Sequence, residues 1–250
     1  MIRVIAAIPS RFASTRLPGK ALINIAGRPL LQWVIEGAKT SKKIDQLLVA
    51  TDDEKIRDLA SSLGVKVKMT SADISNGSDR VWAAVKDEEC DVVLNIQGDE
   101  PLVDGVLLDR LITEFENDRD LNMATVATDI APADILLKDT VKVIVNIKKE
   151  AIYFSRFPIP YSRTNAAQDS KSGVCLKHMG VYAYRKTFLQ RYCDSGVTEL
   201  EKAESLEQLR ALYMGERIKV LYTEHDSWGV DNPEDVIKME KILSSRAGAN

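Results

Sequence analysis

The chain is poor in several features, and each scarcity argues against a class of protein. Its 250 residues include only three cysteines, Cys90, Cys175 and Cys193, whose odd number and wide spacing fit neither a disulfide framework nor a zinc site. No segment approaches the roughly 20 apolar residues that a membrane-spanning helix requires. The apolar run 4–8 is short and leads directly into a proline, so it predicts a first strand rather than an export signal. We therefore expect a cytoplasmic protein that does not act on a membrane.

An excess of positive charge is also absent. With 34 basic and 37 acidic residues the formal net charge is −3, which argues against a surface built for nucleic acid or anionic lipid. The hydrophobic residues, 45% of the total, are enough for one sizeable core, and no internal repeat or linker divides the chain. We expect a single domain over 1–250, in which the cations that matter are gathered locally.

The pattern of apolar residues predicts strands that alternate with helices. Such alternation indicates an α/β fold with three layers (αβα), whose mostly parallel, doubly wound sheet binds ligands at the carboxyl ends of its strands. The second half of the chain is less regular. We expect strands at 4–8, 47–50, 65–69, 92–96, 124–130, 181–184 and 218–223, and a strand pair within 141–154. We expect helices over 54–63, 107–115, 199–214 and 233–243. A further helix should start at Pro29, and another should follow a cap at Ser78 or Asp79.

A cluster of cations follows the first strand, in the segment IPSRFASTRLPGKAL. Arg11, Arg16 and Lys20 supply positive charge around a tight Pro-Gly turn whose backbone N–H groups can face an anion. This arrangement suits a polyphosphate, with a merely solvated basic loop as the alternative. The chain lacks the Walker A pattern and has no G-x-G-x-x-G at its first helix, which excludes a P-loop NTPase and a dinucleotide enzyme.

Two acidic residues are candidate ligands of Mg²⁺. Asp99 follows the strand 92–96 in the segment NIQGDEP, where a carboxylate beside a phosphate loop can bind the ion. Glu100 precedes a proline, and we expect it to point to solvent. In GVDNPED, Asn232 and the following proline account for the start of the last helix, which leaves Asp231 as the second candidate ligand or as a turn residue.

Two further segments carry polar groups whose roles the pattern leaves open. In KHMGVYAY, His178 and Tyr182 fall on one face of a strand, and the histidine is either a ligand of the substrate or a structural group. In ESLEQLR, Leu206 and Leu209 face inward on an expected helix, so Glu207 and Gln208 face either a ligand or solvent.

Nine segments together, in register and nearly end to end, resemble the 3-deoxy-manno-octulosonate cytidylyltransferases, or CMP-Kdo synthetases. The resemblance implies a fold of the nucleotide-diphospho-sugar transferase type, usually dimeric, with a CTP-binding half over about 1–130 and a sugar-binding and dimerisation half over about 131–250. The segments are IPSRFASTRLPGKAL, VATDD, NGSDR, NIQGDEP, VKVI, YFSRFPIP, KHMGVYAYR, ESLEQLR and GVDNPED.

The resemblance also implies a role for each candidate residue. It assigns the triphosphate and catalysis to Arg11, Arg16 and Lys20, Mg²⁺ to Asp99 and Asp231, and the nucleotide to Gly77, Ser78, Arg80 and Gln97. It assigns the acidic sugar to Gln97, Arg156, His178, Tyr182, Glu207 and Gln208. The chain departs from the family's usual His, Ser, Gly and Thr by having Ile74, Asn76, Gly77 and Ser78 at this segment.

The expected reaction is attack of the anomeric hydroxyl of 3-deoxy-manno-octulosonate (Kdo) on the α-phosphorus of CTP. It gives CMP-Kdo and pyrophosphate for lipopolysaccharide biosynthesis, with Asp99 a possible proton acceptor and with no side chain that must be the base. One alternative is a cytidylyltransferase for another acidic sugar, such as 8-amino-Kdo or a sialic acid. Another is a sugar-nucleotide-binding regulator without turnover, against which the pair of metal carboxylates argues.

Overall fold

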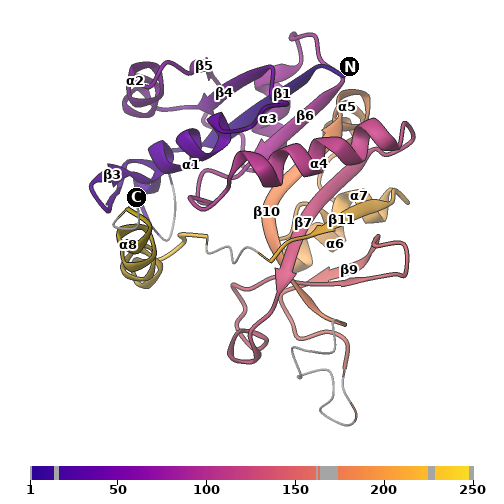
Figure 1. The fold of residues 1–250 in the computed structure, drawn as a ribbon. Coiled ribbons are helices and arrows are strands. Elements are labelled where there is room, and N and C mark those ends of the chain that lie inside the picture. Colours follow the sequence, from indigo (N-terminus) through magenta and orange to yellow (C-terminus); the bar gives the residue numbers. More distant parts are fainter. Residues whose placement is uncertain (1, 14–16, 162, 164–173, 225–228, 248–250) are drawn as a thin grey trace.

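One large sheet lies at the centre of the molecule (Figure 1). The structure, a computed structural model, describes residues 2–13, 17–161, 163, 174–224 and 229–247. Within them the sheet has nine strands in the order β11–β7–β10–β6–β1–β4–β5, with β8 paired to β10 and β9 paired to β8. These strands are β1 Val4–Ser10, β4 Gln46–Thr51, β5 Lys66–Met69, β6 Val92–Ile96, β7 Met123–Asp129, β8 Lys142–Val145, β9 Ala151–Ser155, β10 Leu176–Arg185 and β11 Ile218–Tyr222.

The central strands are mostly parallel, as the sequence predicts. Strands β6, β1, β4 and β5 pair in parallel, and so do β7 and β11. Strand β10 runs antiparallel between β6 and β7, so that its first half lies beside the carboxyl ends of its neighbours. There Gln97 N–H, just past β6, donates to the Gly180 carbonyl at 3.2 Å. This edge therefore receives side chains from both halves of the chain.

Helices cover both faces of the sheet, which confirms the three-layer α/β fold. Along β1 the buried side chains alternate: Ala6 and Ile8 pack in one core cluster, Ile5 and Ala7 in the other. None of the helices in the described part of the chain is both long and apolar enough to cross a membrane. The first cluster takes side chains from α1 Leu30–Lys39, α2 Glu54–Ser62 and α4 Gly105–Asn117; the second takes them from α3 Gly77–Val85, α5 Lys186–Asp194, α6 Glu199–Glu204 and α7 Leu209–Tyr213.

The last helix, α8 Pro233–Ala247, returns to the first half of the chain and lies beside β3 and α1 (Figure 1). Met239 and Leu243 of α8 share a core cluster with Ile25 and Leu30. This packing brings the segment before α8 to the edge of the sheet, where Val230 N–H donates to the Asp99 carbonyl at 2.9 Å. The small elements here are η1 Lys20–Leu22, β2 Asn24–Ile25 and β3 Arg28–Pro29; the other short helix, η2, is Pro132–Asp134.

Some element boundaries differ from the predicted ones. Asn76, rather than Ser78 or Asp79, caps α3, because its Oδ1 accepts the Asp79 N–H at 2.8 Å. Pro29 ends β3 and immediately precedes α1 instead of opening it. The helix expected over 199–214 is divided into α6 and α7, since Ser205 takes the left-handed conformation with φ 52°. Helix α5 was not expected, although Phe188 and Tyr192 have helical spacing and are buried.

Candidate active site

A cleft lies at the carboxyl edge of the sheet, formed by two adjoining pockets of about 500 and 370 Å³. The larger pocket contains the residues expected to bind the sugar. The smaller one contains most of those expected to bind the nucleotide, namely Arg11, Lys20, Gly77, Arg80 and Gln97, whereas Ser78 lines neither pocket. Because they share lining residues, the two pockets are parts of one site. The shared residues are Gly77, Gln97, Asp99, Arg156, Ser205 and Asp231.

The loop after β1 lines the smaller pocket, as predicted. Arg11 and Lys20 both line it, and the Arg11 guanidinium donates to the Ser75 carbonyl at 3.1 Å. Gly19 has φ 67° and its N–H donates to the Phe12 carbonyl at 3.1 Å, which closes the turn in a conformation that favours glycine. Arg16 lies outside the described residues. The described part of the loop therefore directs two cations into one polar hollow.

Lys20 lies between the two predicted metal carboxylates. Its Nζ is 2.6 Å from Asp99 Oδ2 and 3.0 Å from Asp231 Oδ1. Burial favours the neutral amine, but the two carboxylates outweigh it and raise the pKa of Lys20. Asn232 caps α8 as predicted, with its Oδ1 accepting the Asp235 N–H at 2.9 Å, and so fixes the backbone next to Asp231.

The two carboxylates fit a divalent cation. They already converge on one positive group, the Lys20 ammonium, so a single ion is within reach of both. In the described part of the chain no cluster of three or more His, Cys, Asp or Glu residues is placed to hold a metal. Two carboxylates, with water and phosphate oxygens as the other ligands, are the coordination that Mg²⁺ commonly takes in proteins.

Gly77 and Gln97 lie where the two pockets meet. A Cβ at position 77 would come within 2.7 Å of Gln97 Nε2, so a larger residue there would displace the Gln97 amide. Gln97 Nε2 donates to Asn95 Oδ1 at 3.3 Å. It also donates to Glu207 Oε1 at 3.5 Å, so these two contacts orient the amide at the junction.

Arg80 and Ser78 support the nucleotide end from behind. Arg80 lines the smaller pocket, although only 2% of its surface is exposed. Its guanidinium donates to the Ile74 carbonyl at 2.9 Å and to Thr70 Oγ1. Burial lowers the pKa of the guanidinium. The Ser78 hydroxyl points into the core, 3.0 Å from the Tyr184 hydroxyl. Asn76, one of the departures from the family pattern, lines the smaller pocket and caps α3.

The six residues expected to bind the sugar all line the larger pocket: Gln97, Arg156, His178, Tyr182, Glu207 and Gln208. All three nitrogens of the Arg156 guanidinium donate to backbone carbonyls: Nε to Glu204 at 3.0 Å, Nη1 to Lys138 at 3.1 Å and Nη2 to Ser205 at 3.4 Å. These contacts fix the plane of the guanidinium at the pocket wall.

His178, which is half-buried, and Gln208, which is buried, are polar groups of this pocket. Burial lowers the pKa of His178 to about 3, so its imidazole is neutral, and Nε2 lies 2.9 Å from Thr125 Oγ1. Gln208 Oε1 accepts from the Tyr182 hydroxyl at 3.2 Å. Gln208 Nε2 is buried with no hydrogen-bond partner in the described structure, which suits a site that supplies an acceptor on binding a ligand.

Glu207 combines burial with a hydrogen bond to helix α3. Its Oε2 accepts the Ser78 N–H at 3.2 Å, in the first turn of α3. Burial dominates over this bond and raises the pKa of Glu207 to about 7. The carboxyl group can therefore exchange a proton near neutral pH.

Sequence reasoning missed two charged residues of this region. Glu100, expected in solvent, is 7% exposed, and its Oε1 accepts the Gly180 N–H at 2.9 Å. Lys142 is fully buried; its Nζ donates to the carbonyls of Leu137 at 2.8 Å, Thr140 at 2.7 Å and Arg156 at 2.5 Å, and burial lowers its pKa. The only signal for Lys142 in the sequence was a lysine inside an apolar run. Its burial could not be predicted, because the carbonyls that accept from its ammonium group come from surrounding segments.

Comparisons with known proteins agree with this geometry. The sequence matches the family model described as cytidylyltransferase over residues 5–218. It is 52% identical to the 3-deoxy-manno-octulosonate cytidylyltransferase of Bdellovibrio bacteriovorus, over 98% of this chain and 99% of that protein. A solved structure of CMP:2-keto-3-deoxy-manno-octonic acid synthetase complexed with CTP superposes with a TM-score of 0.89 at 36% identity, over 98% of this chain and 99% of that chain.

A more distant structure shares the fold alone. It is the 4-diphosphocytidyl-2C-methyl-D-erythritol synthase of Anaerococcus prevotii, with a TM-score of 0.64 at 17% identity, over 96% of this chain and 98% of that chain. The fold and the two-part cleft define a nucleotidyltransferase that works on a nucleoside triphosphate. The chain belongs to the cytidylyltransferase family, in its 3-deoxy-manno-octulosonate cytidylyltransferase branch.

Proposed function

We propose that this enzyme transfers the cytidylyl group of CTP to Kdo, giving CMP-Kdo and pyrophosphate for lipopolysaccharide biosynthesis. The observation that carries the proposal is the junction of the two pockets, where Gln97, Asp99 and Asp231 belong to both. A triphosphate in the smaller pocket and a sugar in the larger one would meet at these residues. The names of the relatives at 52% and 41% identity support the same reaction.

At the nucleotide end, the cations act on the phosphates. Arg11 and Lys20 neutralise charge that moves onto the pyrophosphate as it leaves, and Arg16 is assigned to the same task. Attack on the α-phosphorus needs the acceptor hydroxyl in line with that leaving group. The junction residues therefore act mainly by holding the two substrates in that alignment.

At the sugar end, the side chains suit an acidic 2-keto sugar. The Arg156 guanidinium presents a planar fork that can bind a carboxylate through two parallel hydrogen bonds. Gln208 Nε2 donates to a sugar oxygen, and the neutral His178 exchanges a hydrogen bond without adding charge. Asp99, at the junction, is the proposed acceptor for the proton of the attacking hydroxyl.

The proposal includes Mg²⁺ as cofactor, held by Asp99 and Asp231. Their convergence on one ammonium group supports this ligand pair. A bound Mg²⁺ supplies positive charge at the α-phosphate and lowers the pKa of a neighbouring hydroxyl. For the ion to reach the carboxylates, Lys20 must leave its present position between them.

We also propose a cytoplasmic homodimer. The hairpin of β8 and β9 and the segment after it expose apolar side chains: Ile147 is 97% exposed, Ile152 56%, Phe157 75% and Tyr161 89%. A second copy of the chain would cover such a surface. All three cysteines are free thiols, which supports a reducing compartment. Light scattering with size-exclusion chromatography measures the oligomeric state.

Pyrophosphate release tests the proposed reaction directly. Turnover with Kdo should favour CTP over ATP and GTP, and Kdo should be preferred over 8-amino-Kdo and sialic acids. Equal rates with all three nucleotides contradict the donor assignment, and faster turnover of another acidic sugar contradicts the acceptor assignment. Tight binding of CTP and Kdo without any release of pyrophosphate would point to a regulator instead of an enzyme.

A further inference from the structure

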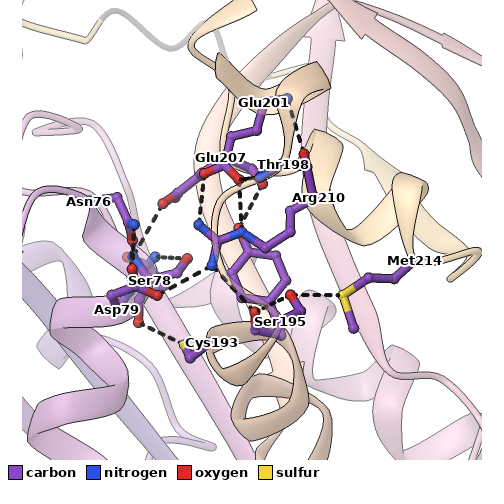
Figure 2. Close-up of polar contacts among 12 residues, drawn as sticks. Asn76, Ser78, Asp79, Cys193, Ser195, Thr198, Glu201, Glu207, Arg210 and Met214 are labelled. Carbon is purple, nitrogen blue, oxygen red and sulfur yellow. Dashed lines mark hydrogen bonds and ion pairs between the residues drawn. The ribbon is translucent and has the colours of Figure 1, made fainter. Parts of the chain in front are cut away.

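Arg210 is a fully buried charged residue that lines neither pocket. Figure 2 shows its guanidinium among groups from three helices. Its Nε and one terminal nitrogen donate to the two carboxylate oxygens of Glu201, each at 2.8 Å. The other terminal nitrogen donates to the Tyr192 carbonyl at 3.3 Å and to Asp79 Oδ1 at 3.4 Å. The guanidinium also lies 4.4 Å from the centre of the Tyr192 ring, so its charge is compensated on every side.

The ion pair of Arg210 and Glu201 spans the turn 205–208. Glu201 belongs to α6 and Arg210 to α7, and the left-handed Ser205 separates the two helices. Glu201 is itself fixed, because its N–H and the Thr198 hydroxyl form one half of a capping box at the start of α6. The pair therefore joins the two helices across the turn that carries Glu207 and Gln208.

A second set of contacts joins this turn to helix α3. Asp79, which Arg210 contacts, also accepts from Asn76 Nδ2 at 2.5 Å, and Asn76 lines the nucleotide end of the cleft. In the opposite direction, the Ser78 N–H of α3 donates to Glu207 Oε2 at 3.2 Å. The Tyr192 hydroxyl, from α5, donates to the Glu207 carbonyl at 2.6 Å. Arg210 thus lies where the turn at the sugar end meets the helix at the nucleotide end.

We propose that Arg210 is a positioning residue, whose contacts with Glu201 and Asp79 hold the turn 205–208 against the start of α3. The proposal rests on the proposed function, in which this turn contacts the acidic sugar. Burying two charges has a desolvation cost, and a well-packed apolar pair often gives equal stability. The benefit of this pair is therefore geometric: the planar fork of arginine fixes the turn in a way that a flexible ammonium does not.

Two variants separate positioning from stability. Arg210→Lys keeps the charge and loses the fork, while the double variant Glu201→Leu with Arg210→Met removes both charges at similar volume, so that no buried charge is left unpaired. Arg217→Lys is the matched control, since Arg217 pairs with Asp118 at 2.7 Å and lines neither pocket. The measurements are kcat, the KM of each substrate and the unliganded Tm.

We expect both Arg210 variants to raise the KM for Kdo about 10-fold or more, the scale of a small misplacement of binding groups, with the KM for CTP within about 2-fold. The control should change neither KM. A folded double variant with a wild-type KM for Kdo, or activity that falls only in proportion to the folded fraction, would overturn the role of Arg210. Absence of turnover in the wild type would instead contradict the proposed function.

Hydrogen exchange gives a readout that does not depend on turnover. In the double variant the amides of 205–208 and the Ser78 N–H should exchange about 10-fold faster or more, while those of β1 keep their wild-type protection. Unchanged protection of the turn would overturn the proposal whatever the activity is.

Discussion

The ammonium group of Lys20 lies 2.6 Å from the carboxylate of Asp99. A second carboxylate, that of Asp231, lies 3.0 Å from the same nitrogen, although it comes from the opposite end of the chain. The lysine thus occupies the place between the carboxylates that the proposed Mg²⁺ would take. On the proposed function, Mg²⁺ and the ammonium would compete for one pair of oxygens, and a bound triphosphate would offer the ammonium another partner.

This competition predicts an unusual response of Lys20→Met to magnesium. The variant should lose about 10²-fold or more in kcat/KM for CTP, because one stabiliser of the phosphate charge is gone. Its unliganded Tm should be lower, because two partly buried carboxylates then repel each other. Added Mg²⁺ without CTP should raise the Tm of the variant more than that of the wild type. Equal Mg²⁺ shifts in a thermal-melt titration contradict the competition; Lys43→Met, which is remote from the cleft, is the control.

The carboxylates themselves should act as a unit. Asp99→Asn and Asp231→Asn should each lower kcat by roughly 10²-fold or more, since each removes a proposed ligand of the same Mg²⁺ ion. The double variant should cost much less than the product of the two single losses. Steady-state kinetics of the three variants across a Mg²⁺ titration measures this coupling. Fully multiplicative losses, or normal Mg²⁺ dependence in Asp231→Asn, would leave Asp231 as a turn residue.

The sequence predicted the central sheet well because its strands are buried and their apolar runs are continuous. The strand 92–96 was predicted with the bounds that the structure has, and Asp99 follows it at the expected edge. Arg11 and Lys20 were found as cations around the tight turn that follows the first strand, and Asp231 as a carboxylate that the start of the last helix does not need.

Other parts of the site depend on tertiary contacts that no local pattern carries. Asp231 approaches Asp99 only because Met239 and Leu243 of α8 pack on the first half of the chain. The break at Ser205 lies in a segment with an ordinary helical pattern, and the Glu201–Arg210 pair that spans it joins residues of two helices. The burial of Glu100 likewise depends on the antiparallel strand β10, because the Glu100 carboxylate accepts the N–H of Gly180 in that strand.

Arg156 is predicted to recognise the carboxylate of the sugar. Arg156→Lys keeps the positive charge but loses the planar fork, so it should raise the KM for Kdo by about 10-fold or more and leave the KM for CTP within about 2-fold. Initial rates with each substrate varied in turn measure the two constants. Arg163→Lys, outside the residues that line either pocket, is the control. A change confined to the KM for CTP contradicts this role.

Glu207 should make the stability of the unliganded enzyme depend on pH. Burial raises the pKa of its carboxyl from 4.5 to about 7 in the folded protein, so between these values the folded state holds a proton that the unfolded state has lost. Stability contributed by this group is therefore fully present below about pH 4.5 and lost as the pH rises towards 7. The loss is on the order of 3 kcal/mol at most, from 1.36 kcal/mol per pKa unit.

Glu207→Gln removes this titration, because the amide has nearly the same shape and stays neutral. Relative to wild type, the free energy of unfolding of the variant should be higher by up to about 3 kcal/mol at pH 8 and by little at pH 5. The Tm of the variant minus that of the wild type should therefore be larger at pH 8 than at pH 5 by roughly 6–10 °C. Thermal melts of the unliganded proteins at both pH values measure it, with Glu199→Gln as the control because that carboxylate is exposed on the same pair of helices. If the Tm difference between variant and wild type is the same at pH 5 and pH 8, Glu207 is already ionised at pH 5. The hydrogen bond from Ser78 and the positive charge of Arg210, which both lower the pKa of Glu207, would then outweigh the effect of burial.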